Sequence, residues 1–354
     1  MTYAQHASSE FNMELHRELT ALTHAISSSL GNSLIALILG GGYGRGEGGV
    51  ICVQEREYPY NDLDFTVVVT NKDPKIATEL HRLSTPVAER LRIEIDFSRP
   101  LTITDIRHWP HWMMWHDLLF GHQVLYGPQD ILTANAPTVV GTPLPLIEAT
   151  RLLLNRGAGV LWALRIAAGM ETAPDADFIR RNYYKCLLAL GDALLITAQK
   201  YTTCYTGRDR LLESVIAQHP AYRNWEVFPQ YQAALAFKFQ PDHLPSATPS
   251  GASLQELALL WGKVWLAVEE LRTKQTWSSL PDYCQWNGLR EPEEHRGGKW
   301  LRNLAMNARR GRLTTVYPRE TLYRRLPLLL QTPEDDAGWR DDSAAFLDVW
   351  RRFN

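Results

Sequence analysis

A short apolar run that ends in clustered glycines constrains the fold of this chain most strongly. Residues 33–39 read SLIALIL, and residues 39–49 read LGGGYGRGEGG. An apolar run of this length with β-branched residues is typical of a buried strand. Glycines lack the Cβ that keeps an anion away from backbone N–H groups, so a glycine loop after a strand can hold phosphate. The sequence therefore predicts a strand followed by a phosphate-binding loop.

Acidic residues alternate with apolar ones in two later segments, NDLDF and IEIDF. Alternate side chains of a strand share a face, so Asp62 and Asp64 point the same way, about 7 Å apart along the chain. Glu94 and Asp96 share the polar face of the second segment. If the two strands are neighbours, Asp62, Asp64 and Asp96 converge, and such a cluster is stabilised by Mg²⁺, which prefers oxygen ligands. We leave Glu94 out of this predicted metal set.

The pattern of elements predicts two domains. Strands are expected at 63–70 and 92–98, with a helix over 11–30 and another around 74–91 that Pro86 should break or kink. The first part of the chain therefore mixes strands and helices around one sheet.

After about residue 145 the pattern becomes helical. Long 3.6-periodic segments cover 144–170, 177–201 and 253–274. We expect an α+β domain with a mixed sheet over residues 1–140, followed by an all-α domain over 141–354.

The order of these motifs resembles the DNA polymerase beta superfamily of nucleotidyltransferases, in the form of bacterial small nucleotidyltransferases with a helical C-terminal domain. The similarity covers roughly residues 30–130, and the segment GHQVLYGPQDIL at 121–132 resembles the strand and loop that close the domain. The residues that match the family motif are Gly41, Gly42, Asp62, Asp64 and Asp96. The resemblance implies two Mg²⁺ ions, for which Mn²⁺ can substitute, and a nucleoside triphosphate, expected to be ATP. It also implies that the all-α domain over 141–354 binds the acceptor of the reaction or closes a cleft.

The resemblance also implies the reaction, in which a nucleoside monophosphate, expected to be AMP, moves to an acceptor hydroxyl and pyrophosphate is released. The predicted catalytic and metal-binding residues are Asp62, Asp64 and Asp96. The predicted nucleotide-binding residues are Gly41, Gly42, Tyr43 through its backbone, Arg45 and Lys185. Glu148 is a candidate acceptor base. For Lys185 a solvated polar stripe, and for Glu148 a first-turn acid favoured by the helix dipole, are the alternatives.

One departure from the family pattern lies between Gly42 and Asp62, where the spacer is long and carries the polar segment VQEREYPYN. Either the 47–61 insertion is a substrate-facing loop, or the glycines align one or two residues away. A dinucleotide site is a rival interpretation, because Gly44, Gly46 and Gly49 match GxGxxG. No amphipathic helix follows that motif, as such a site requires.

Composition and charge limit the classes of acceptor and of cellular compartment that we expect. The formal net charge is −2, so the chain is not a generally basic nucleic-acid binder, but basic residues are concentrated at 296–325. We expect a small-molecule acceptor, with an RNA or protein acceptor bound through this basic run, or a catalytically silent nucleotide-binding module, as alternatives. No secretory leader pattern or long apolar run is visible and the four cysteines are scattered, so we expect a cytoplasmic protein without membrane contact.

Overall fold

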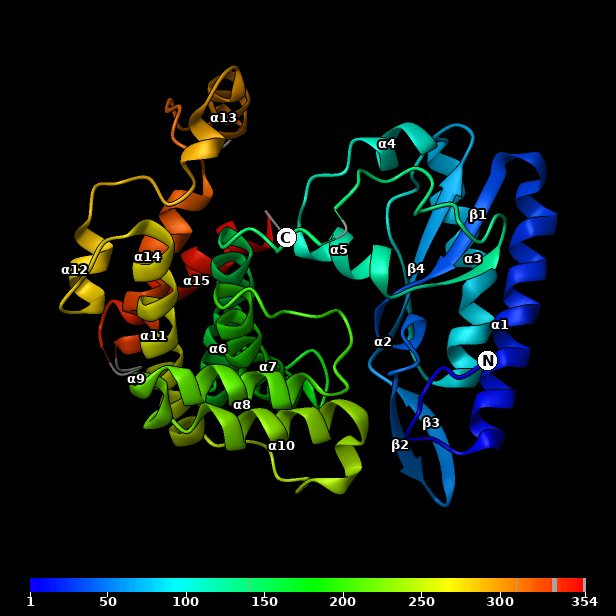
Figure 1. The fold of residues 1–354 in the computed structure, drawn as a ribbon, viewed down its shortest axis with the longest axis horizontal. Helices are drawn as coiled ribbons and strands as arrows, with labels where there is room; N and C mark the ends of the chain where they lie inside the picture. Colours follow the sequence, from blue (N-terminus) through cyan, green and yellow to red (C-terminus); the bar gives the residue numbers. More distant parts are fainter. Residues whose placement is uncertain (140, 310, 333–335, 353–354) are drawn as a thin grey trace. The chain divides into compact units, whose positions relative to one another are not determined.

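The computed structural model describes residues 1–139, 141–309, 311–332 and 336–352, and the chain divides into two compact units (Figure 1). The first unit comprises Met1–Leu144, Tyr201–Arg210 and Leu235–Ser246. The second comprises Pro145–Lys200, Leu211–Ala234 and Ala247–Asn354. Two later segments of the chain thus join the first unit, which the helical pattern after residue 145 does not predict.

A four-stranded mixed sheet lies at the centre of the first unit, in the order β5-β4-β1-β6. Its strands are β1 (Leu34–Leu39), β4 (Asp62–Val69), β5 (Glu94–Phe97) and β6 (Gln123–Tyr126). β1 runs antiparallel to β4 and β6, whereas β4 and β5 are parallel. The predicted strands at 33–39, 63–70 and 92–98 are therefore confirmed.

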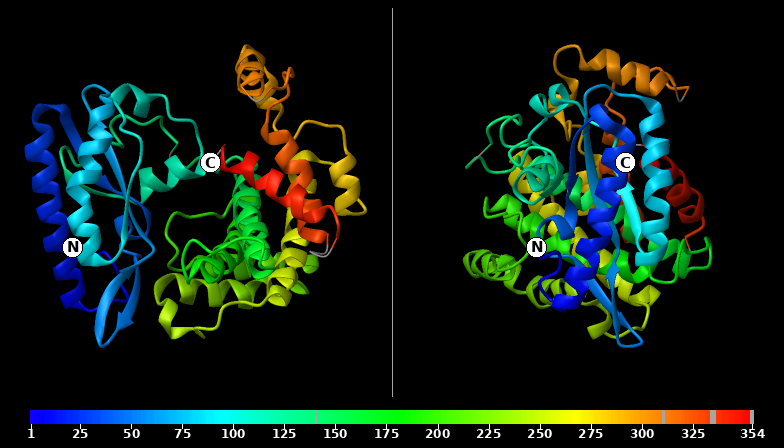
Figure 2. Two further views of the ribbon diagram at one scale, coloured as in Figure 1. Left: turned by 180° about the vertical axis from the view of Figure 1, so that it is seen from behind. Right: turned by 90° about the vertical axis from the view of Figure 1, so that its right-hand side faces the viewer.

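Helices cover both faces of this sheet. The helices are α1 (Ser9–Leu30), α3 (Pro74–Leu91), α4 (Ile103–Arg107) and α5 (Met113–Phe120). α1 and α3 lie side by side on one face (Figure 2), where Leu63, Phe65 and Val67 of β4 join their core. On the other face Val68 packs in a core with Ile106 of α4. Odd-numbered residues of β4 thus face α1 and α3, and even-numbered residues face the opposite side.

The helix predicted around 74–91 is confirmed, and Pro86 does not break it. α3 continues through this residue from Pro74 to Leu91. Pro86 is exposed, so the carbonyl that loses its helical partner can bond water, while Ile76, Leu80 and Val87 bury the opposite stripe. Tertiary packing of that stripe maintains the helix.

The insertion before Asp62 is a β-hairpin. β2 (Gly49–Val53) pairs antiparallel with β3 (Arg56–Tyr60). The two residues that join them, Gln54 and Glu55, both have positive φ angles, of 50° and 65°. This backbone matches the two-residue turns that suit the twist of a hairpin. The segment that the sequence leaves open as a loop is therefore regular structure.

The second unit is helical, and its helices α6, α7 and α11 confirm the helices predicted at 144–170, 177–201 and 253–274. Its helices, two of which extend across a boundary between the units, are α6 (Ile147–Ala167), α7 (Phe178–Thr197), α8 (Arg208–Gln218), α9 (Pro220–Arg223), α10 (Val227–Phe239), α11 (Gly251–Thr273), α12 (Leu280–Gln285), α13 (Lys299–Ala308), α14 (Arg319–Gln331) and α15 (Trp339–Arg351). Within the described residues, none of the helices combines the length and the apolar character needed to cross a membrane.

Candidate active site

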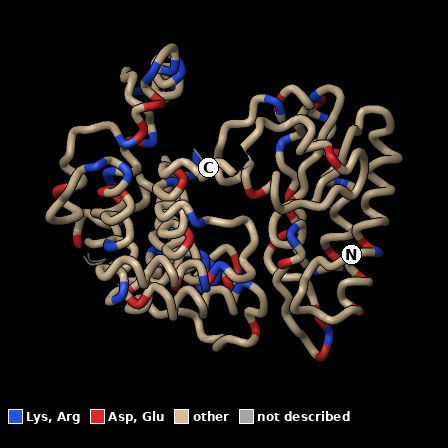
Figure 3. Tube along the Cα trace, in the orientation of Figure 1, with Lys and Arg blue, Asp and Glu red and all other residues tan. Residues whose placement is uncertain are grey.

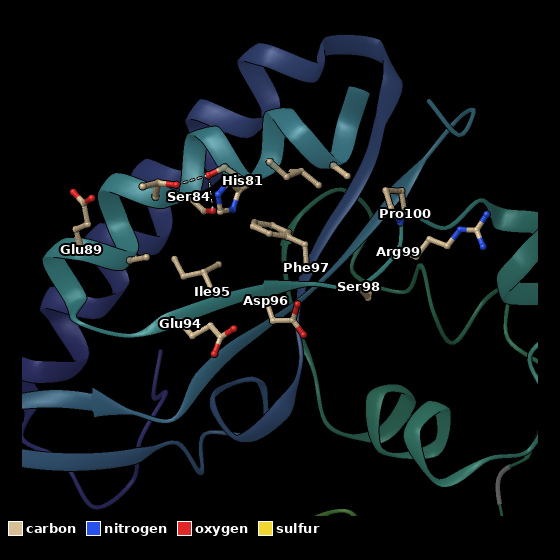
Figure 4. A pocket seen from close by; sticks show the side chains of 14 residues that line it. His81, Ser84, Glu89, Glu94, Ile95, Asp96, Phe97, Ser98, Arg99 and Pro100 are labelled. Atoms are coloured by element: carbon tan, nitrogen blue, oxygen red, sulfur yellow. Dashed lines mark hydrogen bonds between the residues drawn. The ribbon is translucent and has the colours of Figure 1, made fainter. Parts of the chain in front are cut away.

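The acidic residues of β4 and β5 lie on one face of the sheet. In the parallel register Asp64 is the partner of Asp96, and Asp62 is the partner of Glu94. Because the odd-numbered residues of β4 pack against α1 and α3, Asp62 and Asp64 lie on the other face. Figure 4 shows that Glu94 and Asp96 also point away from α3. The structure therefore places the three predicted aspartates on one face of two neighbouring strands, with Asp64 beside Asp96 and Glu94 beside Asp62.

The glycine loop contacts Asp64 directly. It follows β1 and contains the short helix α2 (Gly41–Gly44). The N–H of Gly40 donates to the carbonyl oxygen of Asp64 at 2.8 Å. Gly41 has a φ of +58°, and a Cβ added to it would lie 2.0 Å from Oδ2 of Asp64. A side chain at Gly41 would therefore displace the carboxylate, so glycine is required on steric as well as conformational grounds.

Tyr43 anchors the loop to the hairpin. Its side chain is buried, and its hydroxyl donates to the carbonyl oxygen of Gly49 at 2.6 Å and accepts from the N–H of Tyr60 at 2.8 Å. Burial raises the pKa of Tyr43 far above its ordinary value. The hydroxyl is therefore a neutral structural group, and only the backbone of Tyr43 is available for a phosphate.

Arg45 lies beside a buried carboxylate that the sequence analysis does not single out. Nε of Arg45 donates to Oε2 of Glu47 at 3.3 Å. Glu47 is 3% exposed and also accepts from the N–H groups of Tyr205 at 3.0 Å and Thr206 at 2.8 Å. Burial acts to raise the pKa of Glu47, but these hydrogen bonds to its charged form hold the pKa below its ordinary value. Glu47 thus connects the glycine loop to the segment Tyr201–Arg210.

Lys238, which the sequence analysis also misses, lies against the same loop. Its Nζ donates to the carbonyl oxygen of Glu47 at 3.1 Å. A Cβ added to Gly42 would lie 3.4 Å from Nζ of Lys238. One feature of the sequence does point to this residue. Lys238 is the lone charged residue in the run VFPQYQAALAFKF of α10. A single charge in an apolar helix indicates a position with a specific partner.

The charges around Lys238 set its protonation. Burial lowers the pKa of Lys238 to about 7, and the guanidinium groups of Arg45 and Arg208 act in the same direction. The carboxylates of Glu47 and Asp62 act in the opposite direction. Lys238 is therefore a cation whose charge titrates near neutral pH, beside the glycine loop.

Two predicted residues, Lys185 and Glu148, belong to the helical unit. Lys185 is partly buried on α7. Glu148 lies in the first turn of α6, is buried, and accepts from Nη1 of Arg151 at 2.7 Å. Arg151 also binds Glu291. Glu148 is thus part of a buried ion pair in this unit.

The carboxylates of the first unit fit Mg²⁺ that is bound together with a triphosphate. In the part of the chain that the structure describes, no three or more His, Cys, Asp and Glu side chains are grouped so as to hold a metal ion. Mg²⁺ is often bound by one or two carboxylates plus waters and substrate phosphates, rather than by a cage of protein ligands. Asp64 and Asp96, paired on neighbouring strands beside the glycine loop, supply two such carboxylates.

Acidic residues just before the basic run at 296–325 reduce its charge. Arg296 pairs with Glu293 at 2.5 Å, and Lys299 and Arg302 both pair with Glu294. Figure 3 shows basic positions along α13 with acidic positions beside them. Arg310 lies outside the described residues. The run is therefore partly neutralised within its own unit.

Comparison with known proteins finds no protein-family model that matches the chain and no curated protein that matches it. Among solved structures, the chain is similar to that of spectinomycin adenyltransferase AAD(9) from Enterococcus faecialis with ATP and spectinomycin. The TM-score is 0.43 and the identity is 13%, over 70% of this chain and 98% of that chain.

Proposed function

We propose that this chain is a Mg²⁺-dependent nucleotidyltransferase that moves AMP from ATP to an acceptor hydroxyl. The observation that carries the proposal is the juxtaposition of Asp64 with both Asp96 and Gly41. Asp64 pairs with Asp96 across β4 and β5, and its carboxylate lies where a Cβ of Gly41 would be. Carboxylates for a metal and a loop for phosphates thus meet at one point, as nucleotidyl transfer requires.

The triphosphate would lie along the glycine loop. Gly41, Gly42 and the backbone of Tyr43 supply N–H groups that no Cβ shields at the glycines. Lys238 supplies a positive charge within reach of Gly42, and Arg45 supplies a second one, shared with Glu47. We retain Lys185 as a further candidate for the phosphates.

The aspartates would divide the chemistry between them. Asp62 and Asp64 would hold Mg²⁺, and Asp96 would complete the site on the side of the attacking hydroxyl. Bound Mg²⁺ supplies charge neutralisation for the triphosphate and the leaving pyrophosphate. Asp96, the most exposed of the three, would accept the proton of the acceptor hydroxyl as its oxygen attacks the α-phosphorus of ATP. The O–P bond forms as the bond to pyrophosphate breaks.

We propose a small-molecule hydroxyl as the acceptor, and we keep Glu148 as the alternative to Asp96 for the base that accepts its proton. The basic run at 296–325 supports a macromolecular acceptor less well, because Glu293 and Glu294 neutralise part of it. A cell extract offers every acceptor class at once, so the acceptor need not be known beforehand.

The test follows label from ATP carrying ³²P at its α-phosphate. After incubation with the chain, Mg²⁺ and an extract, the label is measured in the small-molecule, protein and RNA fractions. We expect a labelled small molecule that Asp96→Asn abolishes and that the exposed loop variant Asp130→Asn retains. Label that depends on Asp96 in protein or RNA would reassign the acceptor. ATP binding without labelling of any fraction would identify a silent nucleotide-binding module instead.

A further inference from the structure

A groove of about 650 Å³ runs between α3 and β5 in the first unit (Figure 4). On the strand side, every residue from Glu94 to Pro100 lines the groove. On the helix side, the groove is lined by residues that recur at helical spacing, every third or fourth position, from Ala77 to Glu89. Successive side chains of a strand point to opposite faces, so consecutive residues line a groove only where it follows the edge of the backbone. The groove therefore lies between the edge of β5 and one stripe of α3.

The backbone of β5 is open along this groove. β5 is the last strand of the sheet order, and β4 is its partner on the other side. Alternate N–H and C=O groups of an edge strand point away from the sheet. The strand lining, residues 94–100, spans about 20 Å at ~3.3 Å per residue. The helix lining, residues 77–89, spans about 18 Å at 1.5 Å per residue, so the two walls have similar lengths.

The groove has an apolar floor and charged ends. Leu80 is fully buried at its base, and Ile95 and Phe97 point toward α3. Glu89 and Glu94 lie at one end, and Arg99 lies at the other (Figure 4). Within the described residues, none of these three charged side chains forms an ion pair. An occupant therefore needs apolar side chains on one face and complementary charges at its ends.

We propose that this groove binds an extended segment of a partner protein, which adds to β5 as a fifth strand of the sheet. Main-chain hydrogen bonds to β5 would supply affinity, and alternate apolar side chains would fill the space beneath α3. Basic side chains would alternate with them on the opposite face of the added strand, near Glu94 and Asp96. The groove shares the lining residue Asp96 with the candidate active site, but the proposal does not depend on nucleotidyl transfer.

Charge argues against a second copy of this chain as the occupant. Antiparallel pairing of two β5 edges about a two-fold axis keeps each face of the sheet continuous. Glu94 and Asp96 of one copy would then lie opposite the same acids of the other. Like charges directly opposite each other destabilise a strand pair. A segment with Lys or Arg at the alternate positions has the complementary pattern.

The test uses fluorescein-labelled peptides of nine residues in which Val or Leu alternates with Lys. Each peptide has a scrambled partner of the same composition, with apolar and basic residues in separate blocks. Fluorescence anisotropy with the full chain measures both affinities, and we expect the alternating peptides to bind more tightly. Methylating the backbone nitrogens along one edge of a bound peptide should abolish binding, whereas methylation along the other edge should not, since only one edge pairs with β5.

A pair of neighbouring substitutions locates the site. Ala77 lines the groove and Thr78 does not, and both are exposed on α3. We expect Ala77→Trp to weaken binding at least about tenfold, equivalent to about 1.4 kcal/mol, and Thr78→Trp to leave it unchanged. Hydrogen exchange of the backbone of Glu94–Phe97 should slow when peptide binds.

Three results would overturn the proposal. In the first, no alternating peptide binds more tightly than its scrambled partner. In the second, Ala77→Trp and Thr78→Trp bind equally well, which would place the peptide elsewhere. In the third, the chain forms dimers that Ala77→Trp dissociates, which would make a second copy the occupant.

Discussion

Gly41 lies against the carboxylate of Asp64 in the candidate site, and this contact can be tested by adding one methyl group. Gly41→Ala places a side chain at a φ of +58° and 2.0 Å from Oδ2 of Asp64. We expect a loss of about 1–3 kcal/mol in the free energy of unfolding, measured with urea, together with loss of ATP binding. Gly251→Ala is the control, because nothing lies within 4 Å of the added Cβ. Equal stabilities of the two variants would contradict this account of Gly41.

Lys238 makes stability depend on pH. Its pKa is about 7 in the folded state and ~10.4 in an unfolded chain. Between these values the unfolded state binds more protons, so the free energy of unfolding contributed by Lys238 increases as pH rises from about 7 to about 10. Below pH 7 the folded state holds a charged, desolvated ammonium.

Lys238→Met removes this titration. We expect the stability of the variant relative to the wild type to be most favourable near pH 6, and to decline as pH rises through the same window. Urea unfolding at pH 6, 8 and 9.5 measures the difference, with the exposed Lys263→Met as control. A difference that does not change with pH would show that Lys238 has an ordinary pKa.

At the scale of elements, the hairpin β2–β3 supports the glycine loop through one hydroxyl. Tyr43→Phe removes the hydrogen bonds to Gly49 and Tyr60 without changing the ring. We expect it to lower the free energy of unfolding by about 1–2 kcal/mol. Tyr126→Phe, at an exposed position on β6, should change it little. A Tyr43→Phe variant as stable as Tyr126→Phe would show that the hydroxyl does not support the loop.

Local patterns predicted most elements of this fold because each had a clear period. The buried run of β1 and the alternation in β4 and β5 led to the sheet, and the helical spacing led to α6, α7 and α11. Pro86 does not break α3, because packing of one helix stripe outweighs a lost hydrogen bond. The hairpin was missed because the turn at Gln54 and Glu55 uses positive φ angles without glycine or asparagine.

The site was predicted only in part, for a related reason. Asp62, Asp64 and Asp96 lie within strands whose period is visible, so their common face follows from the sequence. Glu47 and Lys238 gain their roles from contacts across 191 residues of sequence, which no local pattern contains.

At the scale of the whole molecule, Glu47 joins segments of the chain that are far apart. Its carboxylate accepts from Tyr205 and Thr206 and pairs with Arg45, and its carbonyl accepts from Lys238. The first unit is thus assembled from three parts of the chain around one buried acid.

Removing this acid should loosen the first unit. We expect Glu47→Ala to lower the free energy of unfolding by about 3–5 kcal/mol, since a buried ion pair loses one partner. The exposed Glu213→Ala on α8 is the control. Limited proteolysis should cut the variant within Tyr201–Arg210 sooner than the wild type. Unchanged stability and protection would mean that these segments are held by other contacts.

Calorimetric titration of ATP, with and without Mg²⁺, tests the central claim most directly. It compares the wild type with Asp64→Asn and with the exposed control Asp130→Asn. We expect the wild type and Asp130→Asn to bind ATP in a Mg²⁺-dependent manner, and Asp64→Asn to lose this binding while it remains folded. Binding that is the same in all three proteins, or absent from all three, would contradict a metal-dependent nucleotide site at Asp64.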